Sequence, residues 1–220
     1  MIEFKLTNQA DMHMLSINLR DDQAYLEPNF VQYIKGPLKV IKDLTKKQTL
    51  LQYYKHGARS LIPKIEGSGT ICCKPILGHF NILELDNKKN HNLICNKNIF
   101  VASQNSVQFK PEINLNLQTL LSSLPLRLHK LSGKGKVILY SKGAMQAIEL
   151  NNEKLSVYAG EVLAYSDTLK ISQNISSDGF WGLSQRSQTT LDFVGTGIVY
   201  IVPYQNIAYL LANRMDNKRN

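Results

Sequence analysis

The sequence of 220 residues contains only three cysteines, and their pattern argues against a disulfide framework. Cys72, Cys73 and Cys95 are odd in number, include an adjacent pair within an apolar run, and form no C-x-x-C motif. Thiols in this pattern are typical of reduced core residues in an intracellular protein.

Long uncharged apolar runs are also missing from the sequence. The best stretches, 137–140, 197–202 and 207–212, fall far short of the roughly 20 residues that a membrane-spanning helix needs. The N-terminal segment carries Glu3, Lys5 and Asp11 and lacks the apolar centre of a secretory signal. We therefore expect a cytoplasmic protein without a transmembrane segment.

Histidines are few and scattered, which argues against a metal site. The segment GHFNILE, which contains His79, is similar to the metal motif of the cupins, but Asn81 replaces the second histidine. In the later segment GAMQAIE the corresponding residues are Ala144 and Gln146. Three protein ligands are the usual minimum for a catalytic metal. We predict no metal and no other cofactor, with His79 in a turn or at the end of a strand.

Catalytic templates are absent as well. No G-x-S-x-G motif occurs, and neither Cys72 nor Cys73 has a histidine nearby in the sequence. Glu84 and Glu149 occupy equivalent places in two similar segments, whereas an acid and a base need different environments. The sequence thus predicts solvent-facing carboxylates on strands and no enzyme activity.

Repetition is the strongest signal that the sequence does contain. The segments GSGTICCKPILGHFNILELD and GKGKVILYSKGAMQAIELNN each combine a G-x-G, an apolar strand, a glycine turn and a closing Glu-Leu. A third G-x-G opens GTGIVYIVPY, and the three motifs follow one another at 66 and 62 residues, starting at 67, 133 and 195. Because each motif leads into a β-rich run, we interpret the glycines as bends and not as phosphate loops. The glycines of this set are Gly67, Gly69, Gly78, Gly133, Gly135, Gly143, Gly195 and Gly197.

The repeat predicts an all-β chain of three similar β-sandwich units with pseudo-threefold symmetry. The expected units are residues 1–66, 67–132 and 133–205, followed by a tail at 206–220. Turns rich in Asp, Asn and Lys are expected at 20–22, 86–90 and 151–154.

One or two short helices are expected beside the strands. Residues 44–56 form either a helix that ends before Gly57 or a tyrosine-rich strand. Ile207, Leu210 and Leu211 have the spacing of a short amphipathic helix.

Two apolar segments lie outside the repeat, namely a predicted strand at 2–6 and the segment 207–211. They either cap the ends of the β core or form an interface, because bare strand edges template association. The candidate interface residues are Ile207, Tyr209, Leu210 and Leu211.

The charge balance is basic, with 26 Lys and Arg against 17 Asp and Glu and a net charge of +9. This raises the prior for a polyanionic partner, yet the lysines are dispersed pairs and not a block. The aromatic pairs Tyr53–Tyr54 and Phe180–Trp181 lack the interleaved basic residues of a single-strand binding surface. Weak, non-specific nucleic-acid binding is the expectation.

The order of G-x-G, glycine turn, Glu-Leu, aliphatic-Ala and final G-x-G resembles that of the altered-inheritance-of-mitochondria / mitochondrial biogenesis family. The resemblance covers residues 14–204 and implies a single-chain pseudo-threefold β protein, similar in fold to the tryptophan RNA-binding attenuation protein. It implies no catalytic residues. The N-terminal third departs from the pattern, because Glu27, Pro28 and Asn29 replace the glycine-marked turn.

Taken together, the sequence predicts a non-enzymatic binding or assembly module that acts through an unknown protein partner or through self-association. An RNA-binding module that uses the basic surface is the alternative, and a degenerate cupin-like enzyme is a third.

Overall fold

The chain is built almost entirely of β-strands. A computed structural model describes residues 1–9, 12–41, 62–86, 92–113, 127–176 and 188–203. Within these ranges the strands form two antiparallel sheets, and the helical elements are short 3-10 turns, η1 (Pro28–Phe30), η4 (Lys97–Ile99) and η5 (Ala159–Glu161). The all-β prediction is confirmed, whereas the two expected helices at 44–56 and 207–211 lie outside the described residues.

The first sheet has eight strands. Its main path runs β3–β5–β2–β8–β11–β6, with β1 beside β2 and β4 beside β5. The strands are β1 (Ile2–Gln9), β2 (Met12–Leu26), β3 (Val31–Lys35), β4 (Leu38–Ile41), β5 (Lys64–Cys73), β6 (His79–Leu85), β8 (Phe100–Gln104) and β11 (Gly135–Ser141). The strand expected at 2–6 is confirmed, since β1 pairs with β2 from Ile2 opposite Leu19 onward.

The second sheet has seven strands. Its main path runs β12–β15–β13–β7–β10–β9, with β14 beside β15. The strands are β7 (Leu93–Asn96), β9 (Val107–Ile113), β10 (Arg127–Gly133), β12 (Gln146–Tyr158), β13 (Val162–Ser166), β14 (Lys170–Ser176) and β15 (Gln188–Ile201).

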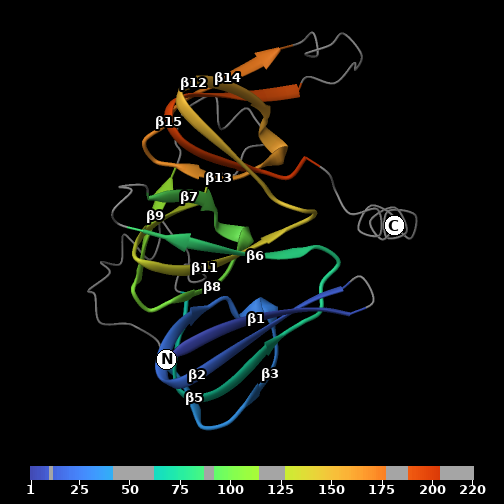
Figure 1. The fold of residues 1–220 in the computed structure, drawn as a ribbon, viewed down its shortest axis with the longest axis vertical. Helices are drawn as coiled ribbons and strands as arrows, with labels where there is room; N and C mark the ends of the chain where they lie inside the picture. Colours follow the sequence, from blue (N-terminus) through green and yellow to red (C-terminus); the bar gives the residue numbers. More distant parts are fainter. Residues whose placement is uncertain (10–11, 42–61, 87–91, 114–126, 177–187, 204–220) are drawn as a thin grey trace.

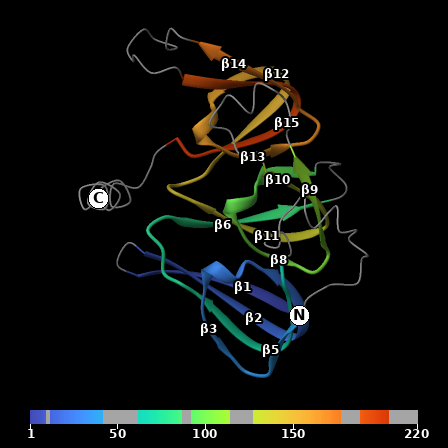
Figure 2. The same cartoon turned by 180° about the vertical axis from the view of Figure 1, so that it is seen from behind.

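The same order of elements occurs three times along the chain. The first series is β2, η1, β3, β4 and β5, and the third is β12, η5, β13, β14 and β15. The second series, β6 to β11 with η4, follows the same order, with its first and last strands each divided in two. Figures 1 and 2 show the three series stacked along the long axis of the molecule, in chain order.

Two of the turns predicted from Asp and Asn are in fact bulges inside long strands. Asp21 and Asn152 adopt left-handed backbone angles, with φ of 51° and 57°, while β2 and β12 continue past them. The backbone N–H of Asp21 donates to Ser68 Oγ at 2.9 Å, and that of Asn152 donates to Thr196 Oγ1 at 3.1 Å. The local chemistry suits a turn, but pairing with a long neighbouring strand keeps each chain extended and only bends it. Most of the third predicted turn, at 86–90, lies outside the described residues.

The second glycine of each G-x-G lies opposite a buried leucine. Gly69 pairs with Leu19, Gly135 with Leu85, and Gly197 with Leu150. Leu85 and Leu150 end the two similar segments that close in Glu-Leu, and Leu19 holds the same place on β2. The strand register therefore agrees with the alignment of those two segments.

Adjacent series join through a short antiparallel pairing, which we call a seam. In the first seam β2 pairs with β8, with Leu26 opposite Ala102. In the second seam β7 pairs with β13, with Cys95 opposite Ala164. In both seams, the strand after the 3-10 turn of one series (β8 or β13) pairs with the strand before the 3-10 turn of the preceding series (β2 or β7).

Three clusters of buried apolar side chains form the core. The first combines residues of the first series, such as Leu15 and Ile71, with Phe80 and Ile138 of the second. The next is centred on Phe100 and Leu139 of the second series. The last cluster, around Phe193, draws its described side chains from the third series alone.

Candidate functional site

The first glycine of each G-x-G has a left-handed backbone, and at two of the three another segment of the chain approaches it closely. Gly67 and Gly133 have φ of 121° and 104°. A Cβ atom on either residue would lie 2.5 Å from a backbone oxygen, that of Pro37 or of Ser106. These positions therefore accept only glycine, and no helix begins beside them that could hold a phosphate.

The remaining glycines of the set lie in comparable places. Gly195 has φ of 128°, and Gly78, just before β6, has φ of 155°. Gly143 is buried after β11, where its carbonyl oxygen accepts a hydrogen bond from Ser141 Oγ at 2.6 Å. The whole set supports the path of the backbone and forms no pocket.

The structure brings together two histidines that are distant in the sequence. His79 opens β6, as a strand-end residue, and its ring lies 4.1 Å from that of His13, centroid to centroid. Burial lowers the pKa of His79, and the neighbouring His13 lowers it further. Within the described ranges, no group of three His, Cys, Asp or Glu side chains could hold a metal ion.

The three cysteines are free thiols in the core. Burial raises the pKa of Cys95 to about 12, and burial together with Cys72 raises that of Cys73 to about 12. A thiol with such a pKa is neutral at pH 7 and a poor nucleophile. The interpretation of the cysteines as core residues is confirmed.

Glu84 and Glu149 remain exposed and far from one another in the topology. Glu84 lies on β6 of the first sheet opposite Lys136, and Glu149 lies on β12 of the second sheet opposite Ile198. Both are solvent-facing strand carboxylates, as predicted, and they do not form an acid–base pair.

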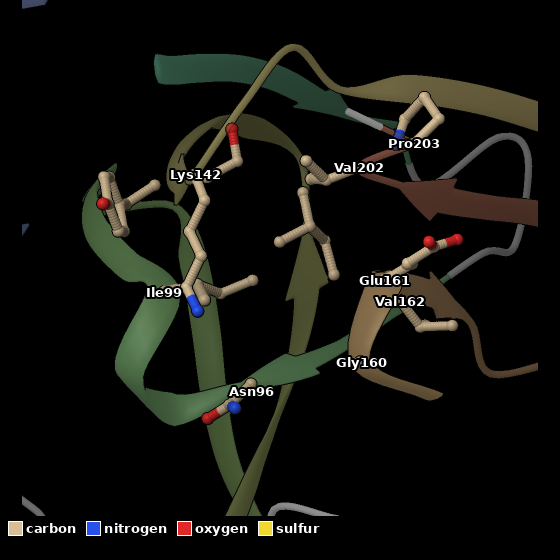
Figure 3. A pocket seen from close by; sticks show the side chains of 11 residues that line it. Asn96, Ile99, Lys142, Gly160, Glu161, Val162, Val202 and Pro203 are labelled. Atoms are coloured by element: carbon tan, nitrogen blue, oxygen red, sulfur yellow. The ribbon is translucent and has the colours of Figure 1, made fainter. Parts of the chain in front are cut away.

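A groove of about 620 Å³ lies where the second and third series meet (Figure 3). Apolar side chains make much of its wall, among them Ile99 of η4, Val162 and Leu163 of β13, and Val202 and Pro203 after β15. Two charged residues, Lys142 and Glu161, also line the groove.

Glu161 is the titratable group of this groove with a perturbed pKa. Burial raises the pKa of its carboxyl above the ordinary value. Its backbone oxygen accepts a hydrogen bond from the N–H of Val202 at 2.9 Å, which fixes η5 against the end of β15. Figure 3 shows Lys142 extending along the groove toward Ile99, on the wall opposite Glu161. A groove with apolar walls, one carboxyl group and one amino group is suited to contacts with a peptide chain.

The most exposed apolar residues on strands of the first series belong to β3 and β4. Tyr33 is 53% exposed, Ile34 is 44% exposed and Val40 is 57% exposed. Among the described residues, β3 pairs only with β5. Its counterparts β8 and β13 pair on both edges and are largely buried. Within the described residues, the first series therefore ends in an unpaired strand edge that carries exposed apolar side chains.

The interface predicted from the sequence, at Ile207, Tyr209, Leu210 and Leu211, lies outside the described residues and stays a prediction. The sequence did not mark the edge of β3, because no glycine within Val31–Lys35 distinguishes an edge strand. The signal that the sequence offered was the position of residues 31–35 in the first copy of the repeat. No copy precedes the first one, so the strand there lacks the neighbour that the later copies have.

The family model described as mitochondrial biogenesis AIM24 matches residues 4–204. The chain belongs to this family. The AIM24 match spans all three series and confirms the resemblance noted in the sequence.

A solved structure is similar to this chain in fold over nearly its whole length. The X-ray structure of a protein from Streptococcus pyogenes has a TM-score of 0.74 to this AIM24 chain at 18% identity, covering 99% of this chain and 100% of that one. At this identity the likeness shows the fold alone. No curated protein matches the chain. Across the described part of the chain, no helix is long and apolar enough to span a membrane.

Proposed function

We propose that this AIM24 chain is a non-enzymatic cytoplasmic module that works through protein surfaces, by joining further copies of itself or a protein partner. The observation that carries the proposal is the edge of β3, which pairs only with β5 among the described residues and exposes Tyr33 and Ile34. An exposed apolar strand edge presents unpaired backbone groups and templates association. The groove between Lys142 and Glu161 offers a second surface for a peptide segment.

We further propose that the three series are repeats of one unit, stacked in line. The pseudo-threefold relation expected from the sequence is not confirmed, because a closed threefold would bring β3 and β12 together. The recurring order of elements supports this arrangement, as does the shared pairing of Gly69, Gly135 and Gly197 with leucines. In this view each G-x-G belongs to the end of its unit.

An RNA-binding module is the second candidate, and the net charge of +9 favours it. The two candidates differ in their dependence on salt, because phosphate contacts weaken steeply as salt concentration rises. Contacts between proteins through an apolar strand edge persist as the salt concentration rises.

Sedimentation velocity of the nuclease-treated chain over a wide concentration range tests the proposal. We expect species larger than the monomer that persist at high salt, or a complex with a protein captured from the native cell that also persists at high salt. A chain that stays monomeric and binds no protein would refute the proposal.

The sequence-derived interface is tested separately by charged substitutions at Tyr209 and Leu210. If these residues form a contact surface, assembly or partner binding is lost while the melting temperature hardly moves. Should the variant unfold instead, the residues cap the β core and the assembly surface lies elsewhere.

A further inference from the structure

The two seams inside the chain have the same strand register. Leu26 faces Ala102 in the first seam, and Cys95 faces Ala164 in the second. All four side chains are almost fully buried. The seam is therefore a packing mode that this fold uses repeatedly.

Each end of the stack carries one half of a further seam. At one end β3 is the counterpart of β8 and β13, and in the described ranges it pairs only with β5. At the other end the second half of β12 is the counterpart of β7, and there it pairs only with β15. Figures 1 and 2 show β3 and β12 at opposite ends of the molecule, so the two edges do not meet within one chain.

The register of the two seams can be transferred to these free edges. Tyr33, Ala102 and Ala164 hold equivalent places in the three series. Each pairs with the last long strand of its own series: Tyr33 with Cys72 of β5, Ala102 with Ile138 of β11, and Ala164 with Tyr200 of β15. The transferred register places Tyr33 opposite Val157.

In this register Ile34 lies opposite Ser156, and Lys35 lies opposite Leu155. Ile34 is 44% exposed in the single chain, so that pairing would remove apolar area from water. Lys35 would lie diagonally across from Glu153, which brings opposite charges together.

We infer that copies of this chain join head to tail, with β3 of one copy pairing with the second half of β12 of the next copy in the register of the internal seams. This inference rests on the proposed assembly function and specifies its surface. A second copy is the occupant that fits, because both halves of the seam are present on one chain. Such a heterologous contact closes into a ring or continues as an open chain of copies, according to the rotation at each step.

Disulfide trapping across the new seam tests the register. One variant carries Ile34→Cys, a second carries Ser156→Cys, and the two are mixed under mild oxidation with the native thiols buried. We expect a cross-linked dimer of the two variants. Glu149→Cys is the matched control, because it is exposed on β12 but outside the paired half, and it should not cross-link with Ile34→Cys. Dimers of Ile34→Cys alone would show a symmetric contact between two β3 strands and would overturn the inference.

A charge exchange provides a second test that does not depend on disulfide geometry. Lys35→Glu should weaken self-association by about two- to five-fold, and adding Glu153→Lys to that variant should restore it. Both side chains are exposed, so the melting temperature should stay within error of the parent. If the chain self-associates equally well with Lys35→Glu and with the double variant, the β3–β12 contact is refuted and the proposed function still stands. A chain that binds a different protein but never itself also refutes only the β3–β12 contact. A chain that binds neither itself nor another protein refutes the contact and the proposed function together.

Discussion

The carboxylate of Asp167 forms an ion pair with Lys130 across the seam between the second and third series, and Asp167 Oδ2 lies 2.7 Å from Lys130 Nζ. Asn92 adds to this contact, with its side-chain amide donating to the same carboxylate at 2.6 Å. Burial of Asp167 opposes ionisation, but the hydrogen bonds from Asn92 and Lys130 outweigh it and lower the pKa of the carboxyl. The turn after β13 is thereby fastened to β7 and β10.

We expect Asp167→Asn to lower the free energy of unfolding by about 1–2 kcal/mol at neutral pH, because a partly buried charged hydrogen bond is lost. The folded pKa of Asp167 lies below the unfolded one, so its contribution is present above the ordinary carboxyl pKa and is lost as the pH falls through the folded pKa. Urea denaturation at about pH 7 and about pH 2.5 should show a larger difference between parent and variant at the higher pH. Asp21→Asn, at an exposed left-handed position that asparagine tolerates, is the control and should change little. An equal loss at both pH values would contradict the ion-pair account.

The glycine bends predict a second contrast. Gly67→Ala should destabilise the protein by at least about 1–3 kcal/mol, since alanine is strained at this φ and its Cβ would contact the backbone oxygen of Pro37. Gly160→Ala is the matched control, because no atom lies within 4 Å of a Cβ there. Thermal denaturation of the two variants measures the difference. Equal stability would mean that the backbone at residue 67 adapts to a side chain.

The cysteines should resist modification in the folded protein. Cys73 and Cys95 are neutral and buried, so a thiol-specific reagent should label them only after denaturation. Counting labelled thiols by mass spectrometry, with and without urea, provides the measurement. Fast labelling of Cys95 under native conditions would show that the second core cluster opens.

Nucleic-acid binding should be weak and should collapse as salt concentration rises. The chain carries +9 but disperses its basic residues, which favours loose attraction to phosphates through counterion release. Fluorescence anisotropy with several RNA and DNA sequences at low salt and at about 150 mM salt checks this. Sub-micromolar, sequence-selective affinity at the higher salt would make RNA binding the leading function.

Local chemistry made part of the fold predictable. Leu85 and Leu150 could be aligned because the segments that contain them share a G-x-G, a glycine turn and a closing Glu-Leu, and such bends depend on a few adjacent residues. Local chemistry gave the wrong prediction at Asp21 and Asn152, where turns were expected and the structure has bulges. A left-handed residue suits a turn and a bulge equally, and only the partner strand decides between them.

The candidate site was less predictable, since it depends on pairing over long distances. Ile34 is exposed because β3 has no second neighbour among the described residues, and no property of residues 31–35 reveals that. The contact of His13 with His79 joins two elements of different series. Only the fold brings the two rings together.

The composition of the last core cluster predicts the order in which parts of this molecule unfold. Within the described residues, the cluster around Phe193 includes no side chain of the first two series, so we expect the C-terminal third to unfold as a cooperative unit of its own while the rest stays folded. Amide hydrogens of β14 and of the adjoining half of β15 should exchange with solvent well before those of β5 and β11. Partial unfolding would then start at the same end that presents β12 to the next copy, so that joining copies would also protect the least stable part of each one.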